Sequence, residues 1–284
     1  MMGGMILLPN DPRVSTVLGT WLSMTILAAI LMLLRSKLAQ EKREEKKPGG
    51  FWSKMGSYLF INALYIILAW AQYQIFACSV IMLGYVCMFE IAKVSRTCRE
   101  GTGLFASPHY FAVSSALMVA VLAYNNPELS FKVLVFLGVV HTLVASFNGP
   151  IENLILRASL SAVSVLYIPI CLGCHLFLKW VDDSGFLILF YYLIVCATDS
   201  FGQIIGTILG GRRISPEISP NKTLSGAIGG IVAAIVVAYA IRDCMPNTPL
   251  TSTLFCGVYI SISAQVGDLV ISSWTRFPRI KDFG

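Results

Sequence analysis

Apolar residues form nine runs along the chain, separated by polar segments. In hydrocarbon, every backbone N–H and C=O must be hydrogen-bonded within the protein, and a run of about 20 apolar residues achieves this as a helix. The alternation of apolar and polar residues that is typical of strands is absent from these runs. The pattern therefore predicts an all-α, polytopic integral membrane protein of about nine transmembrane helices. The runs lie at residues 14–34, 57–72, 74–91, 109–124, 130–147, 158–180, 185–206, 223–241 and 250–271.

The second and third runs are the least clearly separated. Residues 57–91 are too many for one untilted helix and few for two, so we expect a tight hairpin that turns at Tyr73–Gln74. The overall composition agrees with a lipid environment, because 56% of the residues are hydrophobic, only 13% are charged and the mean hydropathy is +0.73. These values exclude an ordinary soluble domain.

The distribution of basic residues predicts the orientation, because Lys and Arg are retained on the cytoplasmic side of a membrane. Of the 21 Lys and Arg residues, all but four lie in alternate polar segments that would share one face. We therefore expect the N-terminus outside and the C-terminus in the cytoplasm. The net charge of +6 then reflects topology and contact with lipid headgroups, so no nucleic-acid partner is expected. The four exceptions are Arg13, Lys132, Lys179 and Arg242.

The chain divides into three predicted regions. Residues 1–56 would form an N-terminal anchor helix and a basic cytoplasmic linker, because the first run lacks the basic start and the cleavage site of a signal peptide. Residues 57–180 would form scaffold helices, and residues 181–284 a catalytic membrane region with cytoplasmic motif loops. We expect the protein in a bacterial inner (cytoplasmic) membrane, and the sequence leaves a homodimer open.

Carboxylates within or beside the apolar runs are costly in lipid and are therefore candidates for a functional site. Asp199 interrupts the seventh run, Asp268 lies near the end of the last run, and Asp282 lies in the C-terminal tail. Glu90 ends the third run, where a pair with Lys93 one helical turn later is the simpler explanation. For Asp199 and Asp268, a hydrogen bond between helices is the structural alternative.

A long polar segment between the seventh and eighth runs opens directly into the next predicted helix. Arg212, Arg213 and Lys222 supply positive charge for phosphate oxygens. Ser219 and Thr223 offer hydroxyl groups next to a helix N-terminus, where anions bind well. The segment therefore predicts a phosphate-binding site, with a plain basic cytoplasmic loop as the alternative.

The order of these motifs resembles the phosphatidate cytidylyltransferase (CDP-diacylglycerol synthase) family. In that family, an aspartate within a span is followed by a glycine-bearing loop, Ser-Pro-x-Lys-Thr at a helix start, a Gly-Asp element and a basic Lys-Asp element. This order is reproduced by Asp199, Ser219-Pro220-Asn221-Lys222-Thr223, Gly267-Asp268 and Lys281-Asp282. The ordered set covers about the C-terminal third of the chain and is more specific than any one motif.

The resemblance implies transfer of a cytidylyl group from CTP to phosphatidic acid, which yields CDP-diacylglycerol for phospholipid synthesis and releases pyrophosphate. Such a site must hold two anionic substrates together, and a hard divalent cation such as Mg²⁺ suits that task. By resemblance, the catalytic residues would be Asp199, Lys222 and Asp268. The substrate-binding residues would be Arg212, Arg213, Ser219, Thr223, Arg276 and Lys281, and the metal ligands Asp199, Asp268 and Asp282.

The sequence departs from the family pattern near its end. Ile271 stands where the family usually carries an acidic residue before the serine, and the expected basic pair is reduced to Thr275-Arg276. The family's Pro-Gly-His-Gly-Gly segment and Asp-Arg-x-x-Asp element would follow Gly284. We therefore expect either a truncated version of an active enzyme or a divergent member with altered or lost activity.

Other functions remain compatible with the same residues. A CTP-dependent lipid kinase, a cytidylyltransferase for another lipid phosphate and an inactive homologue all need similar anion sites. A secondary transporter would use Asp199 and Asp268 for ion coupling. The absence of an internal repeat and the position of the motifs at one interface argue against transport.

Overall fold

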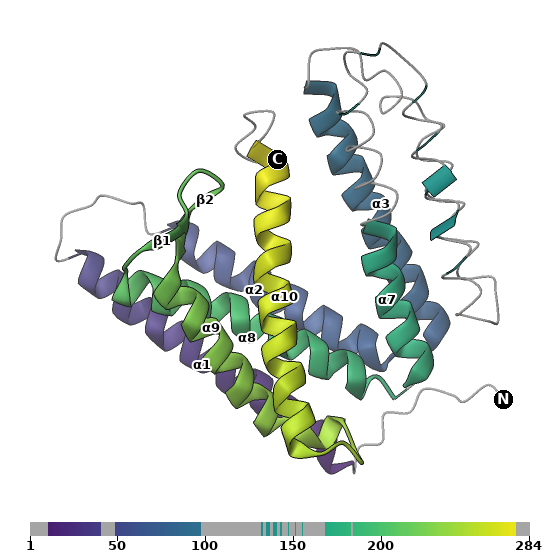
Figure 1. Ribbon diagram of the computed structural model, residues 1–284. Coiled ribbons are helices and arrows are strands. Elements are labelled where there is room, and N and C mark those ends of the chain that lie inside the picture. Colours follow the sequence, from purple (N-terminus) through teal and green to yellow (C-terminus); the bar gives the residue numbers. More distant parts are fainter. Residues whose placement is uncertain are drawn as a thin grey trace. The chain divides into compact units, whose positions relative to one another are not determined.

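The computed structural model describes residues 11–40, 49–97, 168–182 and 184–276, together with scattered positions between 132 and 155 (Figure 1). Helices cover the central part of each predicted apolar run wherever the structure describes it. The predicted run 109–124 lies outside the described residues. The elements are α1 (Pro12–Gln40), α2 (Gly49–Trp70), α3 (Tyr73–Thr97), α7 (Ile168–Val181), α8 (Phe186–Leu209), β1 (Arg213–Ser215), β2 (Ser219–Thr223), α9 (Leu224–Ala240), the 3-10 helix η3 (Arg242–Cys244) and α10 (Leu250–Arg276).

Three of the described helices contain a segment long and apolar enough to cross a membrane, namely Pro12–Leu31, Phe186–Leu209 and Leu250–Ser273. Shorter apolar helices occur at Gly56–Trp70, Tyr73–Cys87, Ile170–Val181 and Leu224–Ala240. The protein is thus a mostly helical membrane protein, whereas the nine spans and their orientation stay predictions. The break between the second and third runs falls at Ala71–Gln72, slightly before the predicted turn.

The described residues fall into two packed units. The first comprises the described residues of Met1–Trp70 and Ser184–Trp274, and the second comprises those of Ala71–Asp183 and Thr275–Gly284. In the second unit, α3 packs against α7. These units follow packing, so the predicted division into anchor, scaffold and catalytic regions stays a prediction.

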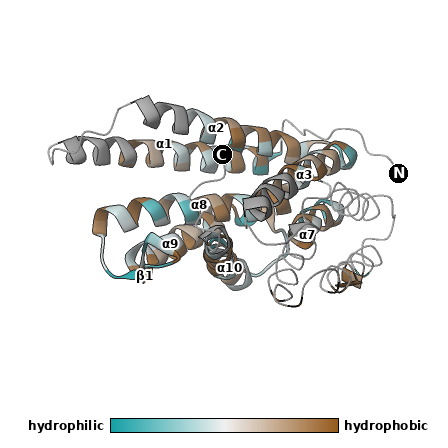
Figure 2. Ribbon diagram, turned by 90° about the horizontal axis from the view of Figure 1, so that it is seen from above, coloured by the Kyte–Doolittle hydropathy of each residue, from teal (hydrophilic) through white to brown (hydrophobic). Residues whose placement is uncertain are grey.

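Helix α8 is the central element of the first unit, and α1, α2 and α9 all pack against it. Figure 2 shows α8 between α1 and α2 on one side and α9 on the other. Ile188, Leu193 and Ala197 of α8 are completely buried. By contrast, Phe255 of α10 is 70% exposed, and large apolar side chains in such positions suit contact with lipid.

The segment after α8 corrects the all-α prediction, because it forms a two-stranded antiparallel ribbon, β1–β2. Gly210 and Gly211 have φ values of 63° and 105°, which side-chain-bearing residues rarely adopt, and they turn the chain out of α8. Open strand edges are excluded from hydrocarbon but are tolerated where water can bond them. Four of the eight residues from Arg213 to Pro220 are exposed and none is buried, in line with a ribbon at the membrane surface.

The ribbon leads directly into α9. Arg213 pairs with Thr223 across the two strands, and the backbone N–H of Leu224 donates to the carbonyl of Arg212 at 2.9 Å. The first residue of α9 is therefore tied to the beginning of the ribbon, and the two strands form a rigid support for the residues at their ends.

Helices α8 and α9 approach so closely that their backbones touch. A Cβ on Gly226 would lie 2.5 Å from the carbonyl oxygen of Gly202 and 3.1 Å from the Cα of Gly206. Small residues allow such close crossings in membranes, where packing and not hydrophobic exclusion joins the helices. The crossing brings the N-terminus of α9, with the ribbon attached, against the C-terminal half of α8.

A buried polar network joins α2 to α8. The Oδ1 of Asn62, a residue that is 2% exposed, accepts hydrogen bonds from the hydroxyl of Tyr192 at 3.0 Å and the thiol of Cys196 at 3.4 Å. The Nδ2 of Asn62 donates to the carbonyl of Tyr58 at 2.7 Å, and the Tyr58 hydroxyl lies 2.9 Å from Ser200 Oγ. In an apolar environment these bonds satisfy groups that would otherwise be costly to bury.

We expect Asn62 and Tyr192 to be energetically coupled. In a double-mutant cycle with Asn62→Leu and Tyr192→Phe, unfolding free energies in detergent should give a coupling of about 0.6 to 1.7 kcal/mol, as measured for hydrogen bonds between membrane helices. A cycle of Ser23→Ala with Tyr192→Phe is the control, because within the described residues the Ser23 hydroxyl bonds the Gly19 carbonyl of its own helix and no group of α8. Strict additivity in the first cycle would show that the network does not join α2 to α8.

Candidate functional site

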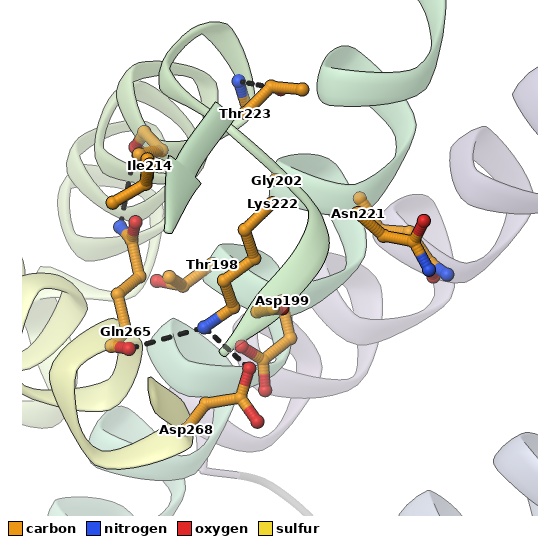
Figure 3. A pocket seen from close by; sticks show the side chains of 13 residues that line it. Thr198, Asp199, Gly202, Ile214, Asn221, Lys222, Thr223, Gln265 and Asp268 are labelled. Atoms are coloured by element: carbon orange, nitrogen blue, oxygen red, sulfur yellow. Dashed lines mark hydrogen bonds and ion pairs between the residues drawn. The ribbon is translucent and has the colours of Figure 1, made fainter. Parts of the chain in front are cut away.

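A cavity of about 390 Å³ lies where α8, the β-ribbon, the start of α9 and α10 meet (Figure 3). Its volume is within the usual range for small-molecule sites. Polar side chains from α8, β2 and α10 face it, together with a few apolar or small residues of β1, α8 and α9. The lining residues are Thr198, Asp199, Gly202, Gln203, Ile214, Ser219, Asn221, Lys222, Thr223, Gly226, Ala227, Gln265 and Asp268.

Lys222 is held between β2 and α10. Its Nζ lies 2.5 Å from Oδ2 of Asp268 and donates to the carbonyl oxygen of Gln265 at 3.2 Å. Lys222 is 25% exposed and Asp268 is 54% exposed, so solvent screens the pair and its contribution to stability is small. The accessible ammonium and carboxylate remain available to a charged ligand.

Asp199 completes a group of three charges. Figure 3 shows the Asp199 carboxylate close to the Asp268 carboxylate and to the Lys222 ammonium. The three side chains come from α8, α10 and β2, respectively. Asp199 is repelled by Asp268 and attracted by Lys222. Because two carboxylates share one ammonium, the group carries a net negative charge and favours a cation in the pocket.

Thr223 caps α9 and fixes the ribbon to it. Its Oγ1 accepts from the backbone N–H of Gly226 at 3.2 Å and lies 3.0 Å from Ser225 Oγ, and the Ser225 hydroxyl in turn donates to the carbonyl of Gly210. Threonine is a favoured N-cap because its side chain satisfies a free N–H of the first turn. These bonds connect the end of α8 to the start of α9. They hold in place the end of β2, the strand that carries Lys222.

The structure brings together five of the residues that sequence reasoning assigned to a site. Asp199, Lys222 and Asp268 line the cavity with Ser219 and Thr223. The sequence placed these residues in three separate motifs, and the crossing of α8 and α9 together with the position of α10 brings the motifs together.

The remaining predicted residues have different positions. Arg212, directly before the ribbon, and Arg213, the first residue of β1, are exposed and do not line the cavity. Arg276 is the last residue of α10, but its side chain lies outside the described part of the structure. Lys281 and Asp282 lie wholly outside the described residues, as does the side chain of Glu90 in α3.

Sequence reasoning gave no role to four polar residues of the cavity: Thr198, Gln203, Asn221 and Gln265. Gln203 follows Asp199 by one helical turn, and Gln265 precedes Asp268 by nearly one turn. Helical spacing from the two aspartates could therefore have identified both glutamines. Thr198 and Asn221 are direct chain neighbours of Asp199 and Lys222.

The carboxylates suit a hard divalent cation. Mg²⁺ is typically held by one or two carboxylates, with substrate phosphates and water completing its shell. Asp199 and Asp268 provide two carboxylates in one cavity. The described residues contain no group of three or more His, Cys, Asp or Glu side chains suited to a metal. Any metal held there would therefore need ligands from its substrate and water as well.

These features define a helical membrane protein with a polar cavity suited to phosphate groups and a cation. Comparison with known proteins specifies this class, because residues 52–284 match the Cytidylyltransferase family. The match covers most of the chain, and the protein belongs to this family. The resemblance found in the sequence motifs is thereby confirmed.

Two curated relatives carry a more specific description. A phosphatidate cytidylyltransferase of Rickettsia bellii (strain RML369-C) is 35% identical over 130 residues, which are 43% of this chain and 56% of the relative. A phosphatidate cytidylyltransferase of Rickettsia conorii (strain ATCC VR-613 / Malish 7) is 32% identical over 130 residues, with the same 43% and 56% coverage. The match thus spans only a little over half the length of these relatives.

Proposed function

We propose that this protein transfers a cytidylyl group from CTP to phosphatidic acid, and thereby forms CDP-diacylglycerol for phospholipid synthesis. The observation that carries the proposal is the meeting of Lys222, Asp199 and Asp268 in one cavity of a cytidylyltransferase-family protein. The names of the relatives from Rickettsia support the same reaction. A membrane enzyme can take its lipid substrate by lateral diffusion and its nucleotide from water.

The reaction joins two anions. A phosphate oxygen of phosphatidic acid forms a bond to the α-phosphorus of CTP, while the bond from that phosphorus to the oxygen bridging to the β-phosphate breaks and pyrophosphate leaves. The attacking oxygen is already anionic at neutral pH, so no general base is needed. The protein must therefore orient the two phosphates and offset their repulsion.

Lys222 is the proposed phosphate ligand. Its ammonium can exchange the Asp268 carboxylate for phosphate oxygens, since both are accessible. Ser219 and Thr223 would donate hydroxyl hydrogen bonds from the same strand. Arg212 and Arg213 lie at the start of the ribbon, where they would attract anionic substrates to the cavity. Arg276 and Lys281 stay proposed phosphate contacts.

Asp199 and Asp268 are the proposed ligands of Mg²⁺, with Asp282 as a further one. The cation would supply charge neutralisation for the pyrophosphate leaving group. Asp199 and Asp268 would hold that positive charge against the nucleotide, and Lys222 would remain beside it. Their origin on α8 and α10 makes the site depend on the packing of both helices.

Labelled CTP distinguishes this reaction from its alternatives. We expect ³²P from the α position of CTP to enter lipid when purified protein, phosphatidic acid and Mg²⁺ are present, and ³²P from the γ position to appear in pyrophosphate only. Label that enters lipid only from the γ position would instead identify a lipid kinase. Faster α-label transfer to an isoprenoid phosphate would identify a different lipid substrate, and ion-coupled uptake without CTP turnover would identify a transporter.

The proposed orientation has the N-terminus outside and the C-terminus in the cytoplasm of a bacterial inner membrane. This places the β-ribbon on the side where CTP is available. A C-terminal fusion to green fluorescent protein should therefore fluoresce in bacterial cells, and a C-terminal alkaline phosphatase fusion should be inactive. The opposite pair of results would contradict the orientation. A homodimer stays a proposal that the molecular mass of the detergent-solubilised protein tests.

A further inference from the structure

Two carboxamide side chains in the cavity have no role in the chemistry proposed above. Gln203 comes from α8, one turn after Asp199, and Asn221 comes from β2, directly before Lys222. Both residues are exposed to the open cavity. Within the described part of the chain, neither side-chain amide has a hydrogen-bond partner.

The third amide of the cavity behaves differently. The Nε2 of Gln265 donates to the carbonyl of Ala227 and to Ser261 Oγ, both at 3.3 Å. The bond to Ala227 joins α10 to α9, and the bond to Ser261 lies within α10. Gln265 therefore serves the packing of the site. Gln203 and Asn221 keep both their donor and their acceptor available for a ligand.

The cavity has two chemically distinct ends. In Figure 3, Asp268 and Gln265 lie on one side of Lys222, while Asn221 lies on the other. Successive residues of a strand point to opposite faces, which allows β2 to present Lys222 and Asn221 in different directions. The Lys222 ammonium therefore faces Asp268 and Gln265, while the neutral amide of Asn221 lies apart from that contact.

A neutral amide suits a nucleobase better than a phosphate or an acyl chain. Phosphate oxygens only accept hydrogen bonds and would leave the carbonyl oxygen of the amide unpaired, and acyl chains require apolar surface. The Watson–Crick edge of cytosine presents an amino donor at N4 and acceptors at N3 and O2, and a carboxamide offers the matching acceptor and donor. We propose that Gln203 and Asn221 form the subsite for the cytosine base of CTP, an inference that rests on the proposed cytidylyl transfer.

Two amides are needed for selectivity. A single carboxamide can rotate by half a turn and pair with uracil, whose donor and acceptor are exchanged at N3 and C4. Amides that come from α8 and β2 approach the base from separate elements, so together they read more of its edge than one can. Loss of either amide should therefore weaken CTP binding and reduce its preference over UTP.

The test compares ligands that contain the base with one that lacks it. In Asn221→Leu and Gln203→Leu, the KM for CTP should rise about tenfold or more, which is the effect of losing a base-specific pair of hydrogen bonds. The preference for CTP over UTP should fall in both variants. The inhibition constant of pyrophosphate and the KM for phosphatidic acid should stay unchanged. Gln74→Leu is the matched control, because Gln74 is exposed on α3 and does not line the cavity.

The outcomes separate the subsite from the reaction. An unchanged KM for CTP in both variants, with the wild-type protein active, would overturn the subsite and leave the proposed function intact. Equal changes for CTP, pyrophosphate and phosphatidic acid would indicate a general disturbance and also overturn the subsite. A wild-type protein that neither binds nor turns over CTP would overturn the proposed function and the subsite together.

Discussion

Asp268→Asn should reduce CTP-dependent formation of CDP-diacylglycerol by at least about 100-fold, the range seen when one preorganised electrostatic group is removed from an active site. Asparagine has the shape of aspartate but lacks its charge. The change therefore removes a proposed metal ligand and the partner of Lys222, whose Nζ lies 2.5 Å from the carboxylate. Initial rates at saturating CTP and phosphatidic acid measure the effect.

Asp243→Asn is the matched control for that loss. Asp243 lies in η3, its side chain is 62% exposed, and it does not line the cavity. The control should retain the wild-type rate, and both variants should unfold at the wild-type temperature. An Asp268→Asn rate within twofold of wild type would remove Asp268 from the proposed site.

Gly226→Ala should destabilise the protein by about 1–3 kcal/mol, the usual cost of overpacking, and should abolish most of its activity. The added methyl would lie 2.5 Å from the carbonyl oxygen of Gly202, which is backbone and cannot rotate away. Helices α8 and α9 must separate to admit it. Since α8 carries Asp199 and the ribbon before α9 carries Lys222, their separation would open the site.

Gly19→Ala provides the comparison for this second prediction. A Cβ at Gly19 in α1 would meet nothing within 4 Å, and alanine favours helix more than glycine does. Gly19→Ala should therefore unfold at or slightly above the wild-type temperature in detergent and keep its activity. If Gly226→Ala matched Gly19→Ala in both measurements, the close crossing of α8 and α9 would be wrong.

Much of the helical framework could be predicted from the sequence, because the lipid requirement makes apolar runs and helices nearly equivalent. The starts and ends of α8 and α10 followed their apolar runs to within a few residues. The capping role of Thr223 also has a signal in the sequence, since this hydroxyl residue stands at the first position of the apolar run 223–241. The pairing of helices could not be predicted from the sequence, because the apolar surfaces of different helices look alike in sequence.

The β-ribbon was missed for a physical reason. The polar segment after Leu209 contains glycines, prolines and charged residues, a composition that is typical of loops. Its strands are short, and they are supported by contacts between residues far apart in the sequence. One example is the hydrogen bond from the Ser225 hydroxyl to the Gly210 carbonyl. Only the folded arrangement of α8 and α9 makes that contact available.

The site was predicted in its charges but not in its neutral groups. Asp199 and Asp268 stand out because carboxylates are rare in apolar runs, and Lys222 stands out within its motif. Gln203 and Asn221 carry no such signal in their residue type, since exposed amides are common in any sequence, and Gln203 is marked only by its helical spacing from Asp199. The folded structure is what brings both amides into the cavity that Lys222 lines.

The central claim is that this cavity joins a cytidylyl group to a lipid phosphate, and a doubly labelled reaction tests it most directly. Purified protein with Mg²⁺, CTP labelled with ³²P at the α position and ¹⁴C-labelled phosphatidic acid should give one lipid product that contains both labels in equal amounts, with a matching amount of pyrophosphate. Asp268→Asn should form almost none of it. A lipid product without the α-phosphorus of CTP, or equal product from Asp268→Asn, would contradict the account.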